Sequence, residues 1–263
     1  MQNKDAAGYI LYSAETTLKK NTSRLLLAEL ISFLICMAPM LTAKAFGAGN
    51  DILRRTEVYS YIVSGPLKIS VFHIILNLKR GLKASLKDMY FGFSKAGVMI
   101  NSILLNILAV CLLNYVTRYM YGYHGLIIVA LFFLFVKSWY SICYIAMTDD
   151  PSKNVLYSMM HGWDLMRTNL VQYVLLCVCF VPLYIILYLP SVLLESGKFT
   201  VTEDFIVNAV YNVVGITNTM GAPGTALLAL GCIGSACLHT AQVCFYDYAA
   251  EHNFGYKRQY KTK

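Results

Sequence analysis

The stretch that decides the fold is residues 125–147, which read GLIIVALFFLFVKSWYSICYIAM and contain a single charged residue, Lys137. A helix needs about 20 mainly apolar residues to cross the roughly 30 Å hydrocarbon layer of a bilayer. About six stretches of this chain meet that requirement or come close to it. By number they are 25–43, 59–78, 97–117, 125–147, 171–194 and 225–248. We therefore expect an all-α fold, a polytopic transmembrane helix bundle that forms a single integral membrane domain over residues 1–263.

The composition of the whole chain also favours a membrane protein. Of its 263 residues, 57% are hydrophobic and 14% are charged, whereas an ordinary globular domain has about 25% charged residues. A water-soluble chain with so few charges could not cover its surface, so disorder, a coiled coil and a cytosolic enzyme are all disfavoured. The eight cysteines fall in apolar stretches without the spacing of a disulfide framework or a zinc site, and we expect them to be small packing residues.

The net charge of +8 reports membrane topology and does not indicate nucleic-acid binding. Lys and Arg flank the apolar runs and are concentrated in residues 1–24, 79–96, 148–170 and 249–263. By the positive-inside rule these segments face the cytoplasm, which places both termini on the inner side of a plasma membrane and requires an even number of spans. We expect the first span to be retained and not cleaved as a signal peptide, because Glu29 interrupts it and its leader is long.

Residues 59–78 form the weakest of the six stretches. Gly65 and Pro66 lie near its outer end, and Lys68 and His73 lie inside it. A re-entrant hairpin is the alternative to a full span, and protein would then have to shield its backbone from lipid. The sequence leaves both possibilities open.

Three segments between the spans are typical of amphipathic helices at the cytoplasmic surface. Residues 79–95 carry an apolar stripe of Leu82, Leu86, Met89 and Phe93. A second helix is expected to start at Asp149-Asp150-Pro151 and to carry an apolar stripe of Leu156, Met159, Trp163, Met166 and Leu170. Residues 5–20 are a weaker third case.

Three of the spans each carry one polar stripe, in which spacings of three and four residues place the side chains on one helix face. The stripes are Ser70, His73, Asn77 and Arg80 in the second span, Lys137, Ser141, Tyr144 and Thr148 in the fourth, and Ser235, His239, Gln242 and Tyr246 in the sixth. A charge at the centre of a membrane helix costs about 2.5–3.5 kcal/mol, so we expect the stripes to face one another inside the bundle. Asp247 and Glu29 are the candidate counter-charges.

Two interpretations of these stripes stay open. In the first they form a polar seam that contacts a ligand or a substrate path, with Lys137 and His239 near mid-depth. In the second they are inter-helix hydrogen bonds that hold the bundle together, each worth about 0.6 kcal/mol. Lys137 could also be an interfacial anchor whose ammonium reaches the membrane surface.

The sequence carries no catalytic signature. It lacks the phosphate-binding G-x-x-x-x-G-K-[ST] loop, the H-E-x-x-H zinc motif and the G-x-S-x-G nucleophile turn. His161 and Asp164 share a helix face, but no nucleophile or third partner accompanies them. We expect no enzymatic activity, no cofactor and no metal site.

Two stretches resemble a bacterial integral-membrane family known only as domain of unknown function nine-seven-five. The first comprises Ser64-Gly65-Pro66, residues 76–81 and Asp88-Met89-Tyr90-Phe91-Gly92-Phe93; the second comprises residues 140–151, Ser158, Met166, Arg167 and Asn169. With Phe245-Tyr246, the likeness covers residues 60–180 well and the remainder loosely, and it departs from the family at Arg167-Thr168-Asn169 and Val181-Pro182. The resemblance implies a multi-spanning bacterial membrane protein without established activity, and it supplies no catalytic residues.

From these observations we expect a non-enzymatic, multi-pass bacterial membrane protein that acts in envelope physiology. Its partners would be the lipid bilayer and a bound lipid, peptide or membrane protein, and not nucleic acid. The alternative is a small permease that uses the polar seam. The sequence does not identify the ligand or the oligomeric state.

Overall fold

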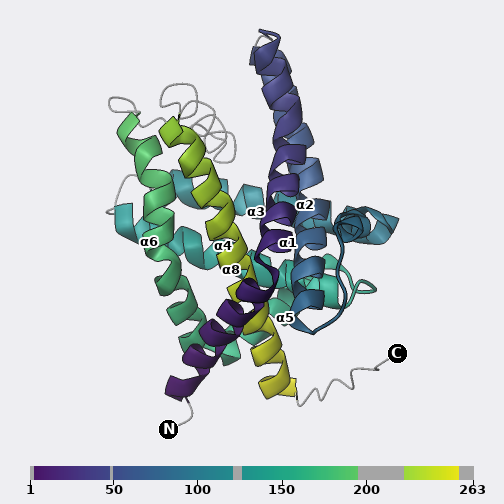
Figure 1. The fold of residues 1–263 in the computed structure, drawn as a ribbon, viewed down its shortest axis with the longest axis vertical. Helices are drawn as coiled ribbons and strands as arrows, with labels where there is room; N and C mark the ends of the chain where they lie inside the picture. The colour runs from purple at the N-terminus through teal and green to yellow at the C-terminus, as the bar shows by residue number, and fades with distance from the viewer. Residues whose placement is uncertain (1–2, 48–49, 121–125, 195–221, 255–263) are drawn as a thin grey trace.

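The computed structural model describes residues 3–47, 50–120, 126–194 and 222–254, and every regular element among them is a helix. In chain order the elements are α1 (Asn3–Ala45), α2 (Asn50–Lys79), the 3-10 helix η1 (Leu86–Phe93), α3 (Ala96–Met120), α4 (Leu126–Asp149), α5 (Val155–Thr168), α6 (Leu170–Leu194) and α8 (Ala222–Phe254). The all-α prediction is thus confirmed for these residues. Figure 1 shows the start of α1 and the end of α8 at the same end of the molecule, with the tip of the α1–α2 hairpin at the other.

Helix α1 is divided by a kink at Asn21, whose backbone leaves the helical region at φ −131° and ψ 17°. The break separates an N-terminal arm from the first predicted span. The buried residues of the arm, Ala6, Ile10, Ala14 and Thr17, recur every three or four positions and so share one face. This part of α1 is therefore amphipathic, and its Tyr9 ring approaches Tyr248 of α8 with a centroid distance of 6.2 Å.

Helix α2 is continuous from Asn50 to Lys79, with Pro66 inside it. No break or reversal interrupts residues 59–78, so the re-entrant hairpin that the sequence left open is not formed. Within the described part of the chain, Val58–Lys79 is the one helix segment that alone is long and apolar enough to cross a membrane. The stretch that looked weakest in sequence is the clearest candidate span.

The prediction of six spans is not confirmed. Two further segments reach the required length and hydropathy only as bent pairs: η1 with residues 96–112 at 82°, and α5 with residues 170–182 at 93°. The described residues therefore supply one candidate span, or up to three if each bent pair counts as one. Parts of the other five predicted spans lie outside the residues whose side chains are described.

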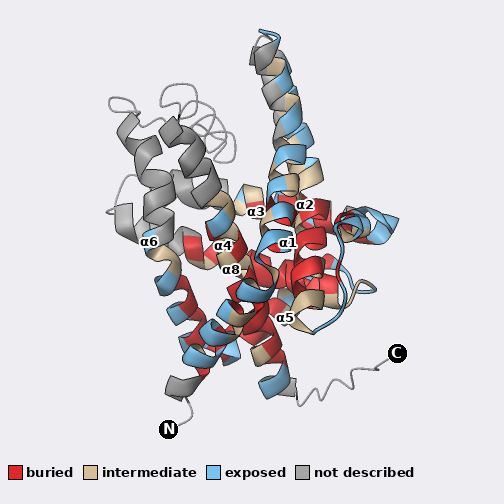
Figure 2. Cartoon of the chain, in the orientation of Figure 1, coloured by how far each residue is buried: buried red, intermediate tan, exposed pale blue. Residues whose placement is uncertain are grey.

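The core lies around the second half of α4. Nearly every residue from Leu134 to Thr148 is buried or half-buried, because α2, α3, α5, α6 and α8 all pack against this helix. A helix that is apolar on all sides is expected at the centre of a bundle. Figure 2 shows the buried residues concentrated where α1, α2, α4 and α8 come together.

The amphipathic α-helix predicted over residues 79–95 is not formed. Gly81 has φ +72°, a conformation that glycine adopts without steric cost, and α2 ends there. A short η1 follows, and at its start Asp88 Oδ2 accepts a hydrogen bond from the Ser85 N–H at 2.7 Å. Of the predicted apolar stripe, only Met89 is buried.

Helix α5 starts four residues later than predicted, at Val155. Its N-cap is Asn154, whose side chain accepts a hydrogen bond from the Tyr157 N–H at 2.9 Å. Asp150 instead stabilises the preceding turn, where its carboxylate accepts hydrogen bonds from the backbone and hydroxyl of Ser152.

The apolar stripe predicted for α5 lies mostly on the exposed face of the helix. Leu156, Trp163 and Leu170 are exposed, whereas Val155, Ser158, Gly162, Leu165 and Met166 are buried. The buried face uses small residues that allow α5 to approach α4 closely. A Cβ added to Gly162 would lie 3.0 Å from Sγ of Cys143.

Glycines also set the close packing of η1 and α3 against α2. A Cβ on Gly65 would collide with the backbone of Ser102 in α3, and one on Gly92 would collide with the backbone of Pro66. Ser70 secures the second contact, because its hydroxyl accepts a hydrogen bond from the Gly92 N–H at 2.9 Å and donates one to the Pro66 carbonyl at 2.9 Å.

Candidate functional site

A cluster of charged side chains joins the C-terminal ends of α2, α4 and α8. Arg80 Nη1 donates to Asp149 Oδ1 at 2.6 Å, and Arg80 Nη2 donates to Asp247 Oδ1 at 2.8 Å. The three side chains are 11%, 16% and 11% exposed, so water screens the ion pairs poorly. We call these three residues the charge clamp.

Aromatic residues surround the charge clamp. The Tyr246 hydroxyl donates to Asp149 Oδ2 at 3.1 Å, and the ring of His161 in α5 meets the Tyr246 ring edge-on at a centroid distance of 6.1 Å. Burial lowers the pKa of His161, against the opposing effect of the Asp149 and Asp164 carboxylates.

The backbone explains why Arg80 reaches both partners. The Arg80 N–H still bonds to the Leu76 carbonyl at 3.0 Å, and the left-handed Gly81 then turns the chain away. Arg80 is thereby fixed at the end of α2, level with the last residue of α4. The arrangement holds three helices together.

A second ionisable pair links α8 to α1. His239 Nδ1 lies 2.5 Å from Glu29 Oε1, and the His239 ring meets Phe72 of α2 edge-on with a centroid distance of 5.0 Å. Glu29 is thus the counter-charge of His239. Asp247, the other candidate, pairs with Arg80 instead.

The rest of the α2 stripe faces η1 and not α4 or α8. The ring of His73 stacks on Phe91 at a centroid distance of 3.7 Å, and Asn77 Nδ2 lies 3.0 Å from His73 Nε2. With the Ser70 bonds to Gly92 and Pro66, these contacts dock η1 on the helix.

The remaining stripe residues enter separate local contacts. Ser141 and Thr148 donate to carbonyls of their own helix, at Lys137 and Tyr144. Gln242 Nε2 donates to the Ser138 hydroxyl at 3.2 Å, and Ser235 is half-buried. Near the charge clamp the structure brings together Arg80 of the second span and Tyr246 of the sixth, which both bind Asp149, whereas Ser141 and Thr148 of the fourth span bond within their own helix.

A polar group that sequence reasoning missed lies between α2, α3 and α4. Asn106 Oδ1 accepts hydrogen bonds from Lys68 Nζ at 3.1 Å and from the Tyr144 hydroxyl at 3.2 Å. Asn106 Nδ2 donates to the Tyr61 carbonyl at 2.7 Å and to the Ser64 hydroxyl at 2.8 Å. The available signal was Asn106 itself, a buried amide and one of three asparagines in the otherwise apolar residues 97–117.

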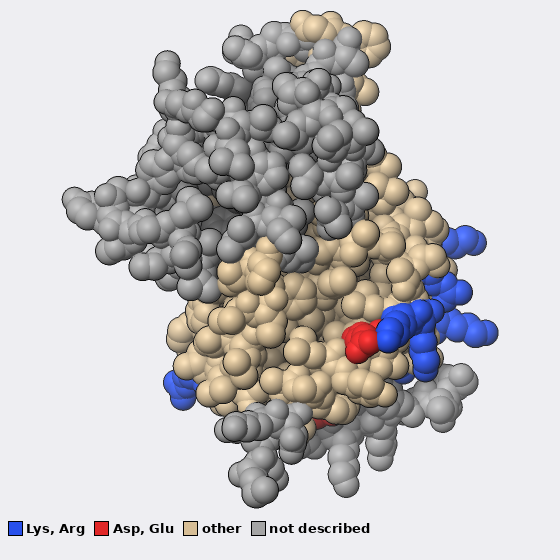
Figure 3. All heavy atoms as spheres, turned by 60° about the vertical axis from the view of Figure 1, so that its left-hand side comes forward, with Lys and Arg blue, Asp and Glu red and all other residues tan. Residues whose placement is uncertain are grey.

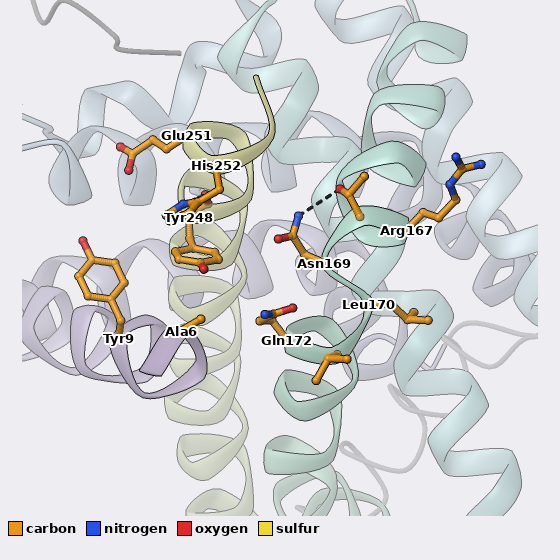
Figure 4. A pocket seen from close by; sticks show the side chains of 11 residues that line it. Ala6, Tyr9, Arg167, Asn169, Leu170, Gln172, Tyr248, Glu251 and His252 are labelled. Carbon is orange, nitrogen blue, oxygen red and sulfur yellow. Dashed lines mark hydrogen bonds between the residues drawn. The ribbon is translucent and has the colours of Figure 1, made fainter. Parts of the chain in front are cut away.

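A crevice of about 710 Å³ opens between α1, the α5–α6 corner and α8. Asn169, Gln172 and Tyr248 surround its space in Figure 4, whereas the charged ends of Arg167 and Glu251 extend away from it. Sequence reasoning did not find this site, because its walls come from three segments far apart in the chain.

The described residues offer no group of three or more His, Cys, Asp or Glu side chains that could hold a metal ion. All eight cysteines are free thiols. The expectation that metal and cofactor are absent stays a prediction.

Comparisons of the chain with known families, with curated proteins and with solved structures return no match. The resemblance to the domain-of-unknown-function family stays a prediction. The geometry of the chain itself carries the functional argument.

Proposed function

We propose that this chain is a non-enzymatic, multi-pass protein of a bacterial plasma membrane, and that the crevice between α1, α5, α6 and α8 binds the head group of an inner-leaflet phospholipid. The observation that carries the proposal is the crevice itself, whose hydrogen-bonding walls adjoin an exposed apolar row on α6. A crevice with polar walls beside an apolar surface suits an amphipathic ligand, which has a polar head and apolar chains.

Membrane insertion is supported by both the helices and the surface. Helices α3, α4, α6 and α8 contain 25, 24, 25 and 33 residues, which at about 1.5 Å per residue is enough for a hydrocarbon layer of about 30 Å. Large apolar side chains are exposed on α3 and α6, where a soluble protein would carry polar ones.

The proposed orientation places the crevice at the cytoplasmic boundary. The start of α1 and the end of α8 lie at one end of the molecule, together with the crevice that they line. On the face shown in Figure 3, the described Lys and Arg side chains gather at and below mid-height, towards that same end. Cationic residues favour the cytoplasmic side of a membrane, so both termini are proposed to be cytoplasmic.

The groups in the crevice suit a hydroxylated head group. Asn169 Nδ2 donates to the Leu165 carbonyl at 3.0 Å and to the Thr168 hydroxyl at 3.1 Å, while its Oδ1 faces the crevice as an acceptor (Figure 4). The Tyr248 hydroxyl points into the same space. These neutral groups can bind the hydroxyls of a glycerol head.

The acyl chains of such a lipid would follow α6 into the membrane. Leu170 and Val171 line the crevice, and the apolar row continues along the same helix. The exposed members of this row are Leu170, Val171, Val174, Leu175 and Val178. Trp163 on the exposed face of α5 is placed for the membrane–water interface, where tryptophan is enriched.

The test is lipid binding to the purified, delipidated chain in detergent micelles, followed by native mass spectrometry. We expect phosphatidylglycerol to bind at least tenfold more tightly than phosphatidylcholine, a difference of about 1.4 kcal/mol, or roughly one net hydrogen bond. Asn169→Leu and Tyr248→Phe should remove this preference. Tyr90→Phe, which changes an exposed residue of η1, should retain it. Equal binding of the two lipids by the unmodified chain, or an unchanged preference in both crevice variants, would contradict the proposal.

A small permease is the second candidate, favoured by ionisable groups inside the predicted spans. The His239–Glu29 pair joins α8 to α1 within two of the predicted spans. The test is a pH gradient across proteoliposomes with an entrapped pH dye. A permease predicts that the gradient collapses faster with the protein present, and that Glu29→Gln and Lys137→Ala abolish the effect while the folded yield is unchanged. If these variants only lower the stability of the folded chain, the polar contacts are structural.

A further inference from the structure

Helix α5 meets α6 at nearly a right angle. Val155–Thr168 and Leu170–Pro182 are bent by 93° where the chain passes through Asn169. Transmembrane helices tilt by only about 20° on average from the membrane normal. Because α6 is proposed to cross the bilayer, α5 then runs close to the membrane plane, over a length of about 21 Å for its 14 residues.

Protein covers one face of α5. The buried residues on this face are Val155, Ser158, Gly162, Leu165 and Met166, and most of them are spaced by three or four positions. Gly162 lies against α4, since a Cβ added to it would be 3.0 Å from Sγ of Cys143. Cys143 comes well before Asp149, the last residue of α4, so α5 packs beside α4 and not beneath its end. The exposed side of α5 therefore faces outward from the bundle.

The exposed side of α5 carries two parallel strips. Leu156, Met160 and Trp163 form the first, which we call the apolar strip, and they are 68%, 69% and 49% exposed. The second, which we call the polar strip, consists of Tyr157, His161, Asp164 and Thr168, and all but the half-buried His161 are exposed. In both strips a spacing of four residues is followed by one of three, so each strip keeps to one side of the helix. At 3.6 residues per turn, the two strips are rotated by about 100° from each other around the helix axis.

This division into three sectors matches a helix in the membrane interface. A helix between protein and water needs only two sectors, one apolar and buried and one polar and exposed. The third sector of α5, which is apolar and exposed, requires an apolar neighbour outside the chain. An interfacial helix has such a neighbour, because its apolar side is immersed about 5–10 Å into the boundary between head groups and acyl chains while its polar side stays in water.

The end of the apolar strip indicates that this neighbour is lipid. Arg167 follows Trp163 on the same side of the helix, and its charged end extends away from the crevice in Figure 4. A long cationic side chain in this position keeps its stem in the apolar layer and its guanidinium among the head groups, where tryptophan is also enriched. The next exposed apolar residues along the chain, Leu170 and Val171, already belong to the row on α6 that is proposed to contact acyl chains.

We infer that α5 lies in the plane of the inner leaflet, with its apolar strip among the acyl chains and its polar strip facing the cytoplasm. The partner of this surface is the leaflet itself and not one bound lipid. The inference rests on the proposed membrane location of the chain and is independent of the lipid selectivity of the crevice. The crevice, which Arg167 and Thr168 line, then opens at the level of the lipid head groups.

The experiment measures the depth of Trp163 in vesicles of phosphatidylglycerol and phosphatidylcholine. The chain has two tryptophans, so Trp139→Phe leaves Trp163 as the single fluorophore. The quenchers are lipids brominated near the head group, lipids brominated near the chain end, and iodide on both sides of the membrane. We expect the shallow bromines to quench Trp163 at least about twofold more strongly than the deep bromines do, and iodide to quench it weakly.

Matched variants test the two strips in the tryptophan-free background Trp139→Phe, Trp163→Phe. Leu156→Trp, in the apolar strip, should be quenched as Trp163 is. Asp164→Trp, in the polar strip beside Trp163, is the control, and iodide should quench it at least about twofold more strongly than Leu156→Trp. If Trp139→Phe folds poorly, the difference in quenching between the unmodified chain and Trp163→Phe gives the depth of Trp163 directly.

Val178→Trp in the same background tests the membrane location of the chain separately. Val178 lies on the exposed row of α6, about 12 Å along the helix from Leu170, and the deep bromines should quench it best. If brominated lipids do not quench Val178→Trp, the proposed membrane location itself fails.

Three results with Trp163 overturn the inference about α5 while Val178→Trp still reports insertion. Quenching by iodide alone would place the apolar strip in water. Shielding from all three quenchers would show that another protein, such as a second copy of this chain, covers the strip. Strongest quenching by the deep bromines would show that α5 is part of a span and not an in-plane helix.

Discussion

Replacing Arg80 with methionine removes the guanidinium that joins α2 to α4 and α8 and keeps much of its aliphatic length. Asp149 and Asp247 would then remain in a poorly hydrated position without their cation, because their side chains are only 16% and 11% exposed. Breaking a buried ion pair by removing one partner costs about 3–5 kcal/mol. The two bridges share one cation and are not additive, so we expect Arg80→Met to lower the free energy of unfolding by about 4 kcal/mol.

The assay is thermal unfolding of the purified chain in detergent. A chain of this size changes Tm by about 2–4 °C per kcal/mol, so the expected loss is about 8–16 °C. Lys83→Met is the matched control, since Lys83 is an exposed cation three residues further along, and its Tm should stay within about 2 °C of the unmodified chain.

A rescue variant separates electrostatics from packing. In the triple variant Arg80→Met, Asp149→Asn, Asp247→Asn, no buried charge is left uncompensated, so it should recover at least half of the lost Tm. The reasoning is refuted if Arg80→Met unfolds within about 3 °C of the unmodified chain, or if the triple variant is no more stable than the single one.

Three further results are expected. Gly92→Ala should destabilise the chain by about 1–3 kcal/mol and increase proteolysis of η1, because its Cβ would strike the Pro66 backbone. Gly97→Ala is the control and should leave stability unchanged, since nothing lies within 4 Å of its added Cβ. Equal destabilisation by the two variants would contradict the packing argument. His239→Ala should lower thermal stability more than Glu29→Gln does. The alanine variant leaves the buried Glu29 carboxylate without His239, whereas the glutamine variant keeps a hydrogen bond to His239. A larger loss of stability in Glu29→Gln would argue against the pair. Reporter tags at the two termini should both report a cytoplasmic location, and tags on opposite sides of the membrane would exclude an even number of spans.

Hydropathy predicted the helical class and the position of the α2 span, because a helix in lipid must satisfy its backbone internally and be apolar along its length. It did not predict which face of α5 is buried. Leu156 and Trp163 are exposed, and the small Ser158 and Gly162 are buried, because close helix packing in a membrane favours small residues. An apolar stripe alone does not distinguish lipid from protein as its neighbour.

The candidate site was predicted in its residue types but not in its pairing. The stripe rule placed Arg80 among the polar positions, and Asp247 was a candidate counter-charge, but their contact depends on the turn at Gly81 that follows α2, and no periodicity encodes that turn. Glu29 was recognised as a candidate counter-charge. Asn106 was not singled out, because Asn101, Asn106 and Asn114 do not follow the three- and four-residue spacing of a stripe. The crevice depends on a corner between α5 and α6, so no local pattern could have predicted it.

The charge clamp can form only in two steps while the chain is being synthesised. Arg80 is separated by 69 residues from Asp149 and by 167 from Asp247, so during synthesis its first partner emerges well before its second. A nascent chain that has not yet delivered α8 can form only half of the clamp. Helix α8 therefore supplies the final carboxylate for an arginine that was translated 167 residues earlier.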